Sequence, residues 1–164
     1  MTVKPIPDGY HTVTPWIISR DTAGLIDYPE EAFDAEEIAR VVGDDVRIEH
    51  AEVRIGDSIV MPFDAPPVWP PTPAFLRLYV EDADAAHRRR RGGGTSVAGV
   101  THLFFGDRVG RVRDPLGNLW WLQTRVEDVS PKEMERRLGD PKWAEVMAYV
   151  QGADFFPGTS RFGA

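Results

Sequence analysis

The stretch that decides the fold is Val109-Gly-Arg-Val-Arg-Asp-Pro-Leu-Gly-Asn-Leu-Trp-Trp-Leu-Gln123, which predicts two β-strands joined by a tight turn over residues 114–118. Pro115 presets φ for a type I turn, and Gly117 supplies the positive φ that a G1 bulge requires. Because strand side chains alternate between two faces, one face is predicted to be dry and the other to mix charge with a large aromatic. The dry face holds Val112, Trp120 and Leu122, and the mixed face holds Arg111, Arg113, Leu119, Trp121 and Gln123.

An earlier segment repeats this plan. Residues 51–61 read as two alternating strands around a two-residue Gly56-Asp57 turn. Two hairpins about sixty residues apart, with matching faces, predict an internally duplicated fold. If Ile55 pairs with Ser58, one face holds His50, Glu52, Arg54, Ile59, Met61 and Phe63, and the other holds Val53 and Val60.

The composition limits the classes of protein to which the chain can belong. Its 164 residues are 42% hydrophobic and 10% aromatic, enough for a core in one domain or in two closely packed modules. The formal net charge of -7 disfavours a nucleic-acid partner. No apolar run is long enough to cross a bilayer and no signal peptide is evident, so we expect no membrane partner and a cytoplasmic location. The absence of cysteine excludes disulfides and thiolate metal sites.

Strand and helix signals precede the first hairpin. Residues 11–18 are predicted to form a strand, and Asp21 to cap a helix that runs to about Phe33. Pro29 falls within that helix and is expected to kink it or end it early. Residues 36–42 are predicted to form a strand before the hairpin.

The same order of elements follows a stiff, proline-rich connector over residues 64–73. Residues 75–80 are predicted to form a strand, and Asp82 to cap a helix, 61 residues after the first cap. Residues 95–102 and 104–105 are predicted to supply another strand before the second hairpin.

Two further helices are predicted after the second hairpin. Ser130-Pro131-Lys132-Glu133 reads as a capping box with proline at the first helical position. Asp140-Pro141 begins the next helix, and its apolar stripe is expected to dock against the body of the protein or a partner. That stripe consists of Trp143, Val146, Met147 and Val150.

The order strand, helix, three strands, repeated twice and with Asp114-Pro-Leu-Gly-Asn118 in the last hairpin, resembles the vicinal oxygen chelate superfamily. This superfamily includes glyoxalase I, extradiol dioxygenases, fosfomycin-modifying enzymes and bleomycin-resistance proteins. The chain looks most like its small bacterial glyoxalase/bleomycin-resistance-like branch, over about residues 4–138. The motifs that carry the resemblance lie at residues 4–16, 50–58, 106–118 and 126–131.

The resemblance implies an α+β fold in which two βαβββ modules form a curved mixed sheet. We expect this domain to occupy residues 1–128, with modules over about 9–63 and 74–126 on either side of the connector. Residues 129–164 are then expected to form a C-terminal helical extension.

Metal-using members of the superfamily place His and Glu ligands on the inner faces of four strands. By this resemblance the four ligand positions fall at Thr14, Met61, Phe75 and Trp121. None of these is a usual ligand for a divalent ion, so we predict no metal and no cofactor. A relocated metal site would need Glu52, His50 and His102 to converge.

Without metal ligands, the cavity is predicted to be an aromatic and thioether-lined slot that suits a flat, partly apolar ligand. Its arginines can meet a carboxylate or a phenolate. The alternative is that these side chains fill the cavity and leave no room. The predicted ligand-binding residues are Thr14, Trp16, Met61, Phe63, Phe75, Arg77, Arg111, Arg113 and Trp121.

These features favour a metal-independent small-molecule-binding protein that sequesters an aromatic or antibiotic-like ligand in a cavity between the two modules. The alternative is a metal-free isomerase, cyclase or lyase of secondary metabolism, in which Glu52 or a histidine such as His50 or His102 is the general base with a raised pKa. A third hypothesis is a metal-dependent lyase or dioxygenase. We expect a homodimer, with or without domain swapping, because a four-stranded half-barrel leaves an edge and an apolar face to cover.

Overall fold

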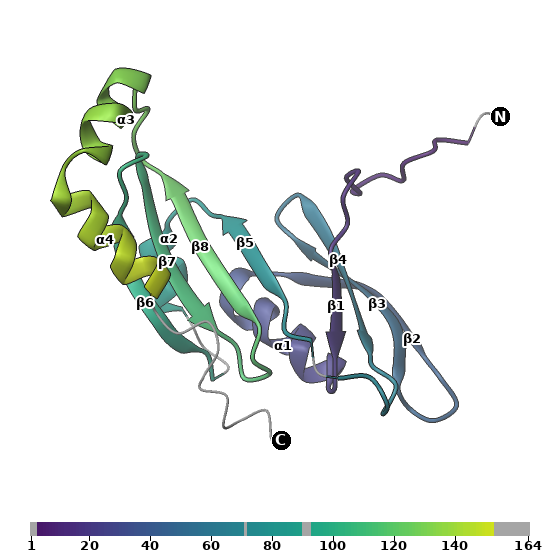
Figure 1. The fold of residues 1–164 in the computed structure, drawn as a ribbon. Helices are drawn as coiled ribbons and strands as arrows, with labels where there is room; N and C mark the ends of the chain where they lie inside the picture. The colour runs from purple at the N-terminus through teal and green to yellow at the C-terminus, as the bar shows by residue number, and fades with distance from the viewer. Residues whose placement is uncertain (1–2, 71, 90–92, 153–164) are drawn as a thin grey trace. The chain divides into compact units, whose positions relative to one another are not determined.

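The computed structural model describes residues 3–70, 72–89 and 93–152 of the chain (Figure 1). These residues form two compact units, each built around a four-stranded mixed sheet. The first unit contains the described residues up to 74 together with 93–94 and the turn 114–118, and the second unit contains the remainder. The predicted α+β fold of two βαβββ modules followed by helices is confirmed, with one sheet in each module.

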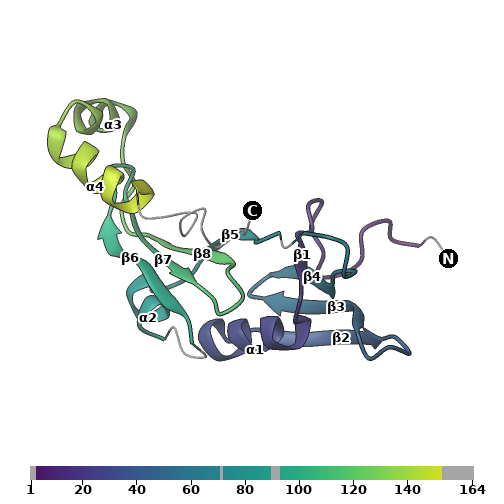
Figure 2. The same cartoon turned by 60° about the horizontal axis from the view of Figure 1, so that its bottom comes forward.

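In the first unit, β1 runs parallel to β4, and β4, β3 and β2 are antiparallel, giving the order β1-β4-β3-β2. Figure 2 shows α1 lying along this sheet, and α1 contacts β3 and β4. Asp21 caps α1 as predicted, by accepting a hydrogen bond from the backbone N–H of Gly24 at 3.0 Å. The elements are β1 (Trp16–Ser19), α1 (Thr22–Phe33), β2 (Glu36–Val42), β3 (Ile48–Ile55) and β4 (Ser58–Asp64).

The first hairpin has the predicted register, with Ile55 opposite Ser58 and Gly56 at a φ of 61°. The two faces also separate as predicted. Val53 and Val60 are at most 6% exposed, and so are Leu25 and Ile26 of α1. The face toward α1 is therefore the core of the first unit.

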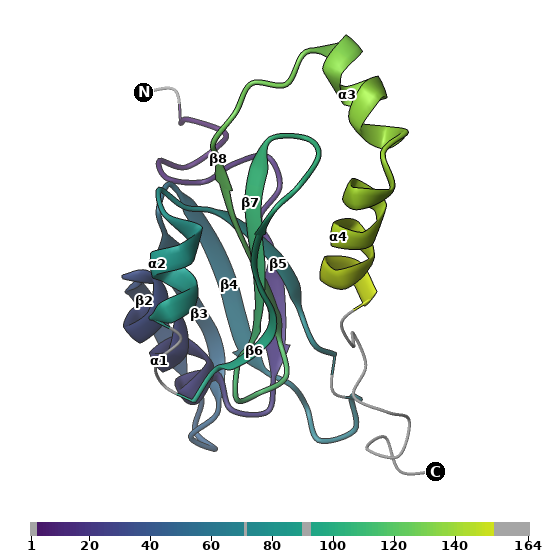
Figure 3. The same cartoon turned by 90° about the vertical axis from the view of Figure 1, so that its left-hand side faces the viewer.

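The second unit repeats this topology in the order β5-β8-β7-β6, with β5 parallel to β8. Asp82 caps α2 as predicted, accepting from the backbone N–H of Ala85 at 2.9 Å. Two helices follow the sheet, and Figure 3 shows α4 lying alongside β6 and β7, which it contacts. The elements are β5 (Phe75–Tyr79), α2 (Ala83–Arg88), β6 (Thr95–His102), β7 (Asp107–Arg113), β8 (Leu119–Arg125), α3 (Pro131–Leu138) and α4 (Pro141–Gly152).

The second hairpin also closes as predicted. The backbone N–H of Asp114 donates to the carbonyl of Asn118 at 3.0 Å, and Gly117 has a φ of 96°. Val112 pairs with Trp120, and both are fully buried on the face that packs against α2. The opposite face, which carries Arg111 and Trp121, is called the inner face of the second sheet below.

Two sequence predictions about these elements are wrong, and one of the two effects expected of Pro29 does not occur. β1 begins at Trp16 rather than at residue 11, because the chain turns first, with the Thr14 hydroxyl donating to the carbonyl of His11 at 3.4 Å. α1 runs to Phe33 as predicted, so Pro29 does not end it early. Residues 104–105 form a turn rather than a strand, closed by a hydrogen bond from the N–H of Gly106 to the carbonyl of Leu103 at 3.0 Å.

The predicted C-terminal helices are present. Ser130 caps α3 by accepting from the N–H of Glu133 at 3.2 Å, whereas the carboxylate of Glu133 bonds to Arg136 and Arg137. The part of the predicted extension beyond Gly152 lies outside the described residues. Across the described ranges, no helix combines the length and the apolar character needed to span a bilayer.

Candidate functional site

The centre of the inner face of the second sheet is a row of three side chains from neighbouring strands. Trp121 of β8 pairs with Arg77 of β5 on one side and with Arg111 of β7 on the other. The guanidinium of Arg77 lies 4.6 Å from the centre of the Trp121 ring, and that of Arg111 lies 5.3 Å from it. The strand register thus places two cations against one indole.

This row borders a cavity of about 230 Å³. Four of the predicted ligand-binding residues line it, but Arg113 does not. Leu76 and Leu119 complete the lining and were not predicted. The pattern of the strands could have identified Leu119, which shares the face of Trp121, whereas nothing in the sequence indicates Leu76. The lining consists of Phe75, Leu76, Arg77, Arg111, Leu119 and Trp121.

The two arginines of this row differ in their exposure to water. Arg77 is exposed, whereas Arg111 is 1% exposed. Burial lowers the pKa of Arg111, and repulsion from Arg113 lowers it further. Both guanidinium groups belong to the lining of the cavity, so it is suited to an anionic group of a ligand.

The next row along the strands is closed by polar contacts. Tyr79, Gln123 and Val109 lie side by side in the register of β5, β8 and β7. The side-chain amide of Gln123 donates to the hydroxyl of Tyr79 at 3.1 Å and to the carboxylate of Asp107. Gln123 is 1% exposed and Val109 is fully buried, so this row forms one end of the site.

In the first sheet, the corresponding face carries a cluster of aromatic residues. Trp16 lies beside Met61 in the register of β1 and β4, and its ring centre is 5.2 Å from that of Phe63. Phe63 in turn lies 6.1 Å from Trp69 of the connector. Trp16 is 66% exposed, so this face is open. Thr14 precedes β1 and is not part of the cluster in the sheet.

The predicted general base, Glu52, lies on the same face of the first sheet. Its carboxylate accepts hydrogen bonds from Tyr10 and from His50, whose Nε2 lies 3.2 Å away, and these contacts lower its pKa. Burial and the neighbouring Glu52 raise the pKa of Tyr10 to about 12. The expected raised pKa of Glu52 is therefore wrong, because its polar neighbours stabilise the ionised form more than burial destabilises it. Tyr10 was missed, since nothing in its sequence context links it to β3.

His102 belongs to the second unit, where it packs under the C-terminal helices. Its ring meets Trp143 of α4 edge-on at 5.6 Å, and its Nε2 lies 3.6 Å from a carboxylate oxygen of Glu127. Throughout residues 3–70, 72–89 and 93–152, no three His, Asp or Glu side chains lie close enough together to hold a metal ion.

The four positions inferred for metal ligands do not fit a divalent ion. In the register, Met61 lies beside Trp16 and Trp121 beside Arg77, so neither Thr14 nor Phe75 is directly opposite them. Neither arrangement offers the imidazole and carboxylate donors that such an ion needs. The residues at these four positions therefore do not match the superfamily's metal centre.

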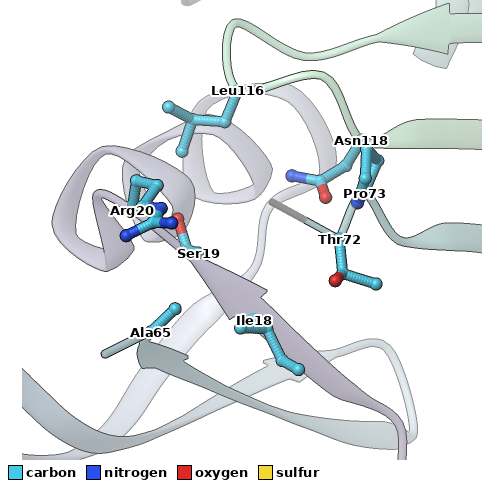
Figure 4. Close-up of a pocket in the computed structure, with 8 residues that line it drawn as sticks. All are labelled: Ile18, Ser19, Arg20, Ala65, Thr72, Pro73, Leu116 and Asn118. Carbon is cyan, nitrogen blue, oxygen red and sulfur yellow. The ribbon is translucent and has the colours of Figure 1, made fainter. Parts of the chain in front are cut away.

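A second, smaller cavity of about 60 Å³ lies in the first unit (Figure 4). The polar side chains around it are engaged within the protein. Arg20 donates to the backbone carbonyls of Pro66 and Pro67, at 3.4 and 3.3 Å, and Asn118 accepts from the N–H of Ala74 at 2.8 Å. This volume has room for only a few waters. The cavity lies where β1, the connector and the 114–118 turn meet.

Comparisons with known proteins agree with this architecture. The family model described as Glyoxalase/Bleomycin resistance protein/Dioxygenase superfamily matches residues 10–122. An uncharacterized protein of Mycobacterium bovis is 34% identical over 138 residues, which cover 77% of this chain and 91% of the relative.

Two solved structures share the fold. TioX from Micromonospora sp. ML1 has a TM-score of 0.60 at 21% identity, over 71% of this chain and 99% of TioX. TnmS3, an antibiotic binding protein from Streptomyces sp. CB03234, has a TM-score of 0.56 at 22% identity, over 76% of this chain and 98% of TnmS3. The family match, the mycobacterial relative and the shared fold lead to one conclusion: the chain belongs to the Glyoxalase/Bleomycin resistance protein/Dioxygenase superfamily.

Proposed function

We propose that this protein binds and sequesters a planar aromatic small molecule that carries a negative charge, and that it does so without a metal ion. The observation that carries the proposal is the Arg77–Trp121–Arg111 row at the edge of the 230 Å³ cavity. The indole and Phe75 offer aromatic surface, and the exposed guanidinium of Arg77 can pair with a carboxylate or a phenolate. A structural relative, TnmS3, is an antibiotic binding protein, which supports capture of a small molecule as the activity.

The electrostatics support an anion over a neutral ligand. Arg77 and Arg111 both lie within 5.3 Å of the Trp121 ring centre, so their charges add in a partly desolvated space. Coulomb interactions are stronger in such a space than in water. An anion bound there is attracted by both guanidinium groups, whereas a neutral ligand of the same shape is not.

Calorimetry with a matched pair of probes tests this proposal. We expect 2-naphthoate to bind saturably, and the neutral 2-naphthamide to bind at least about tenfold more weakly. Arg77→Met should reduce 2-naphthoate affinity by about tenfold, whereas Arg125→Met, which alters an exposed arginine at the end of β8, should not. Equal binding of the two probes would contradict the proposal.

Metal independence needs a separate measurement. Protein treated with EDTA and then freed of chelator should bind 2-naphthoate as tightly as protein supplied with Zn²⁺, Mn²⁺ or Fe²⁺. Affinity that appears only after a metal is added would refute this part of the proposal. The homodimer and the cytoplasmic location stay predictions, and light scattering tests the first.

A further inference from the structure

We propose that α4 limits the size of the ligand, so that the cavity accepts a planar acid of one or two rings and excludes longer ones. This inference rests on the proposed function and adds the substrate class and the element that selects it. Both C-terminal helices follow the residues that match the family model, 10–122.

The length of the site follows from the strand register. The cavity is lined by residues of two successive rows on the inner face, marked on β8 by Leu119 and Trp121. In the third row Gln123 of β8 and Val109 of β7 are buried, whereas Tyr79 of β5 is 68% exposed, so the row is closed on the side of β8 and β7. Rows lie ~7 Å apart and neighbouring strands ~4.8 Å apart. The open part of the face thus has the dimensions of one or two fused rings.

The volume agrees with this length. The cavity has about 230 Å³, below the roughly 300–1,000 Å³ of sites that take drug-sized ligands. A benzoate or naphthoate fits such a space, whereas only part of a large glycosylated or peptidic antibiotic does.

Helix α4 covers the face beyond Trp121. Val150 of α4 is fully buried in an apolar cluster with Leu103 and Val109. Val146, Met147, Phe105 and Trp121 pack against the same cluster. Trp121 therefore borders the ligand cavity and also packs on the cluster that α4 completes. A third ring directed along β7 would meet the helix, because Val150 packs in one cluster with Val109, the residue of β7 in the third row.

The helix is anchored near both of its ends. The hydroxyl of Tyr149 accepts a hydrogen bond from the N–H of Gly99 in β6 at 2.9 Å. Toward the start of α4, Trp143 lies against His102 and under the guanidinium of Arg137, 5.1 Å from its ring centre. Arg137 is tied in turn to Glu127 at 2.5 Å. These contacts make α4 a fixed wall of the unit.

The test compares three acids on the full-length chain by calorimetry: benzoate, 2-naphthoate and anthracene-2-carboxylate. We expect the unaltered protein to bind anthracene-2-carboxylate at least about tenfold more weakly than 2-naphthoate. The double variant Val146→Ala, Met147→Ala removes side-chain volume from the wall. It should reduce that difference to about threefold or less while changing 2-naphthoate affinity by less than about twofold.

A variant that adds volume to the wall distinguishes an effect on the cavity from a loss of folding. Met147→Phe adds volume to the wall and should weaken 2-naphthoate by about fivefold while leaving benzoate within about twofold. Glu145→Ala, on the exposed side of α4, is the matched control and should leave all three affinities unchanged.

The outcomes separate the two proposals. If none of the acids binds the unaltered protein, the proposed function fails and the size limit with it. If the acids bind but the variants keep the same order and ratios as the unaltered protein, the proposed function stands and the role of α4 is overturned. A purely structural role of α4 would lower the melting temperature of the variants without moving these ratios.

Discussion

The two sheets carry the same row of four positions on corresponding faces, with opposite charge. In each row an alanine of the edge strand is followed by a charged residue, then by a Met or Trp, and then by a residue of the first strand of the module. Across the first sheet the row consists of Ala39, Glu52, Met61 and Trp16, where Glu52 lies one residue beyond the Val53–Val60 pair of β3 and β4. Across the second sheet it consists of Ala98, Arg111, Trp121 and Arg77. Duplication has preserved the backbone register while the face chemistry has diverged.

The two faces also differ in how far other parts of the protein cover them. In the first sheet this face is open, with Trp16 66% exposed, whereas in the second Arg111 is 1% exposed and α4 covers Val109. The carboxylate of Glu52 is compensated within the protein by Tyr10 and His50. Burial lowers the pKa of Arg111, and repulsion from Arg113 lowers it further. The comparison teaches that the two faces differ in the sign of their charge and in their cover, so the proposed anion would find its cationic partners on the second face.

The largest expected effect concerns the faces that the two units have in common, those against α1 and α2. Trp120→Ala removes a fully buried indole and should lower the free energy of unfolding by about 3–5 kcal/mol. Val60→Ala, at the corresponding position of the first hairpin, should lower it by about 2 kcal/mol. Chemical denaturation measures both values. A smaller loss for Trp120→Ala than for Val60→Ala would contradict the full burial of Trp120.

Much of this arrangement could be predicted from the sequence, because it depends on local signals. Gly56 and the Asp114–Asn118 turn fix the two hairpin registers, since few residue types adopt a positive φ and a shift by one residue would reverse the faces. Asp21 and Asp82 mark the helix starts, because their carboxylates accept from the first free N–H groups.

What could not be predicted depends on contacts between segments distant in the chain. The parallel pairing of Trp121 with Arg77, rather than with Phe75, is set by packing between β5 and β8. The docking of α4 onto the cluster beside Trp121 is of the same kind. The apolar stripe of α4 predicted a buried face, but no local signal specified the surface that it covers.

Reversing the charge of the second row should abolish the difference between the sheets. Arg111→Glu gives the second row an acidic residue, as in the first. We expect 2-naphthoate affinity to fall on the order of 100-fold, because an attraction becomes a repulsion in a partly desolvated space. Calorimetry provides the affinity, and Arg111→Met separates loss of charge from reversal of charge. Glu52→Gln in the first row is the control, and an equal loss there would mean that the ligand binds elsewhere.

The cover of the second sheet should depend on pH. Hydrogen bonds from Arg136 and then Arg137 lower the pKa of Glu133 to about 2, and Arg137 also lowers the pKa of Glu127. Because these folded-state pKa values lie below the usual 4.5, the stabilisation is complete above pH 4.5 and is lost as the pH falls toward about 2. We expect the indole resonance of Trp143 to shift in this window before that of Trp120. Glu133→Gln should weaken the pH dependence of the Trp143 resonance. Simultaneous shifts of the Trp143 and Trp120 resonances would contradict the prediction that the cover responds first.

The smallest expected effect tests the first row and the enzymatic alternative together. Tyr10→Phe removes the hydroxyl that contributes most to lowering the pKa of Glu52, so that pKa should rise toward 4.5 while His50 still holds it below that value. Both groups are near the surface, so the free energy of unfolding should change by less than about 1 kcal/mol. Titration of the Glu52 carboxyl carbon by NMR measures the shift, with Glu36, an exposed glutamate of β2, as the reference. A Glu52 that titrates at about 6–7 in the unaltered protein would restore it as a candidate general base, because a base is most effective when its pKa lies near the operating pH.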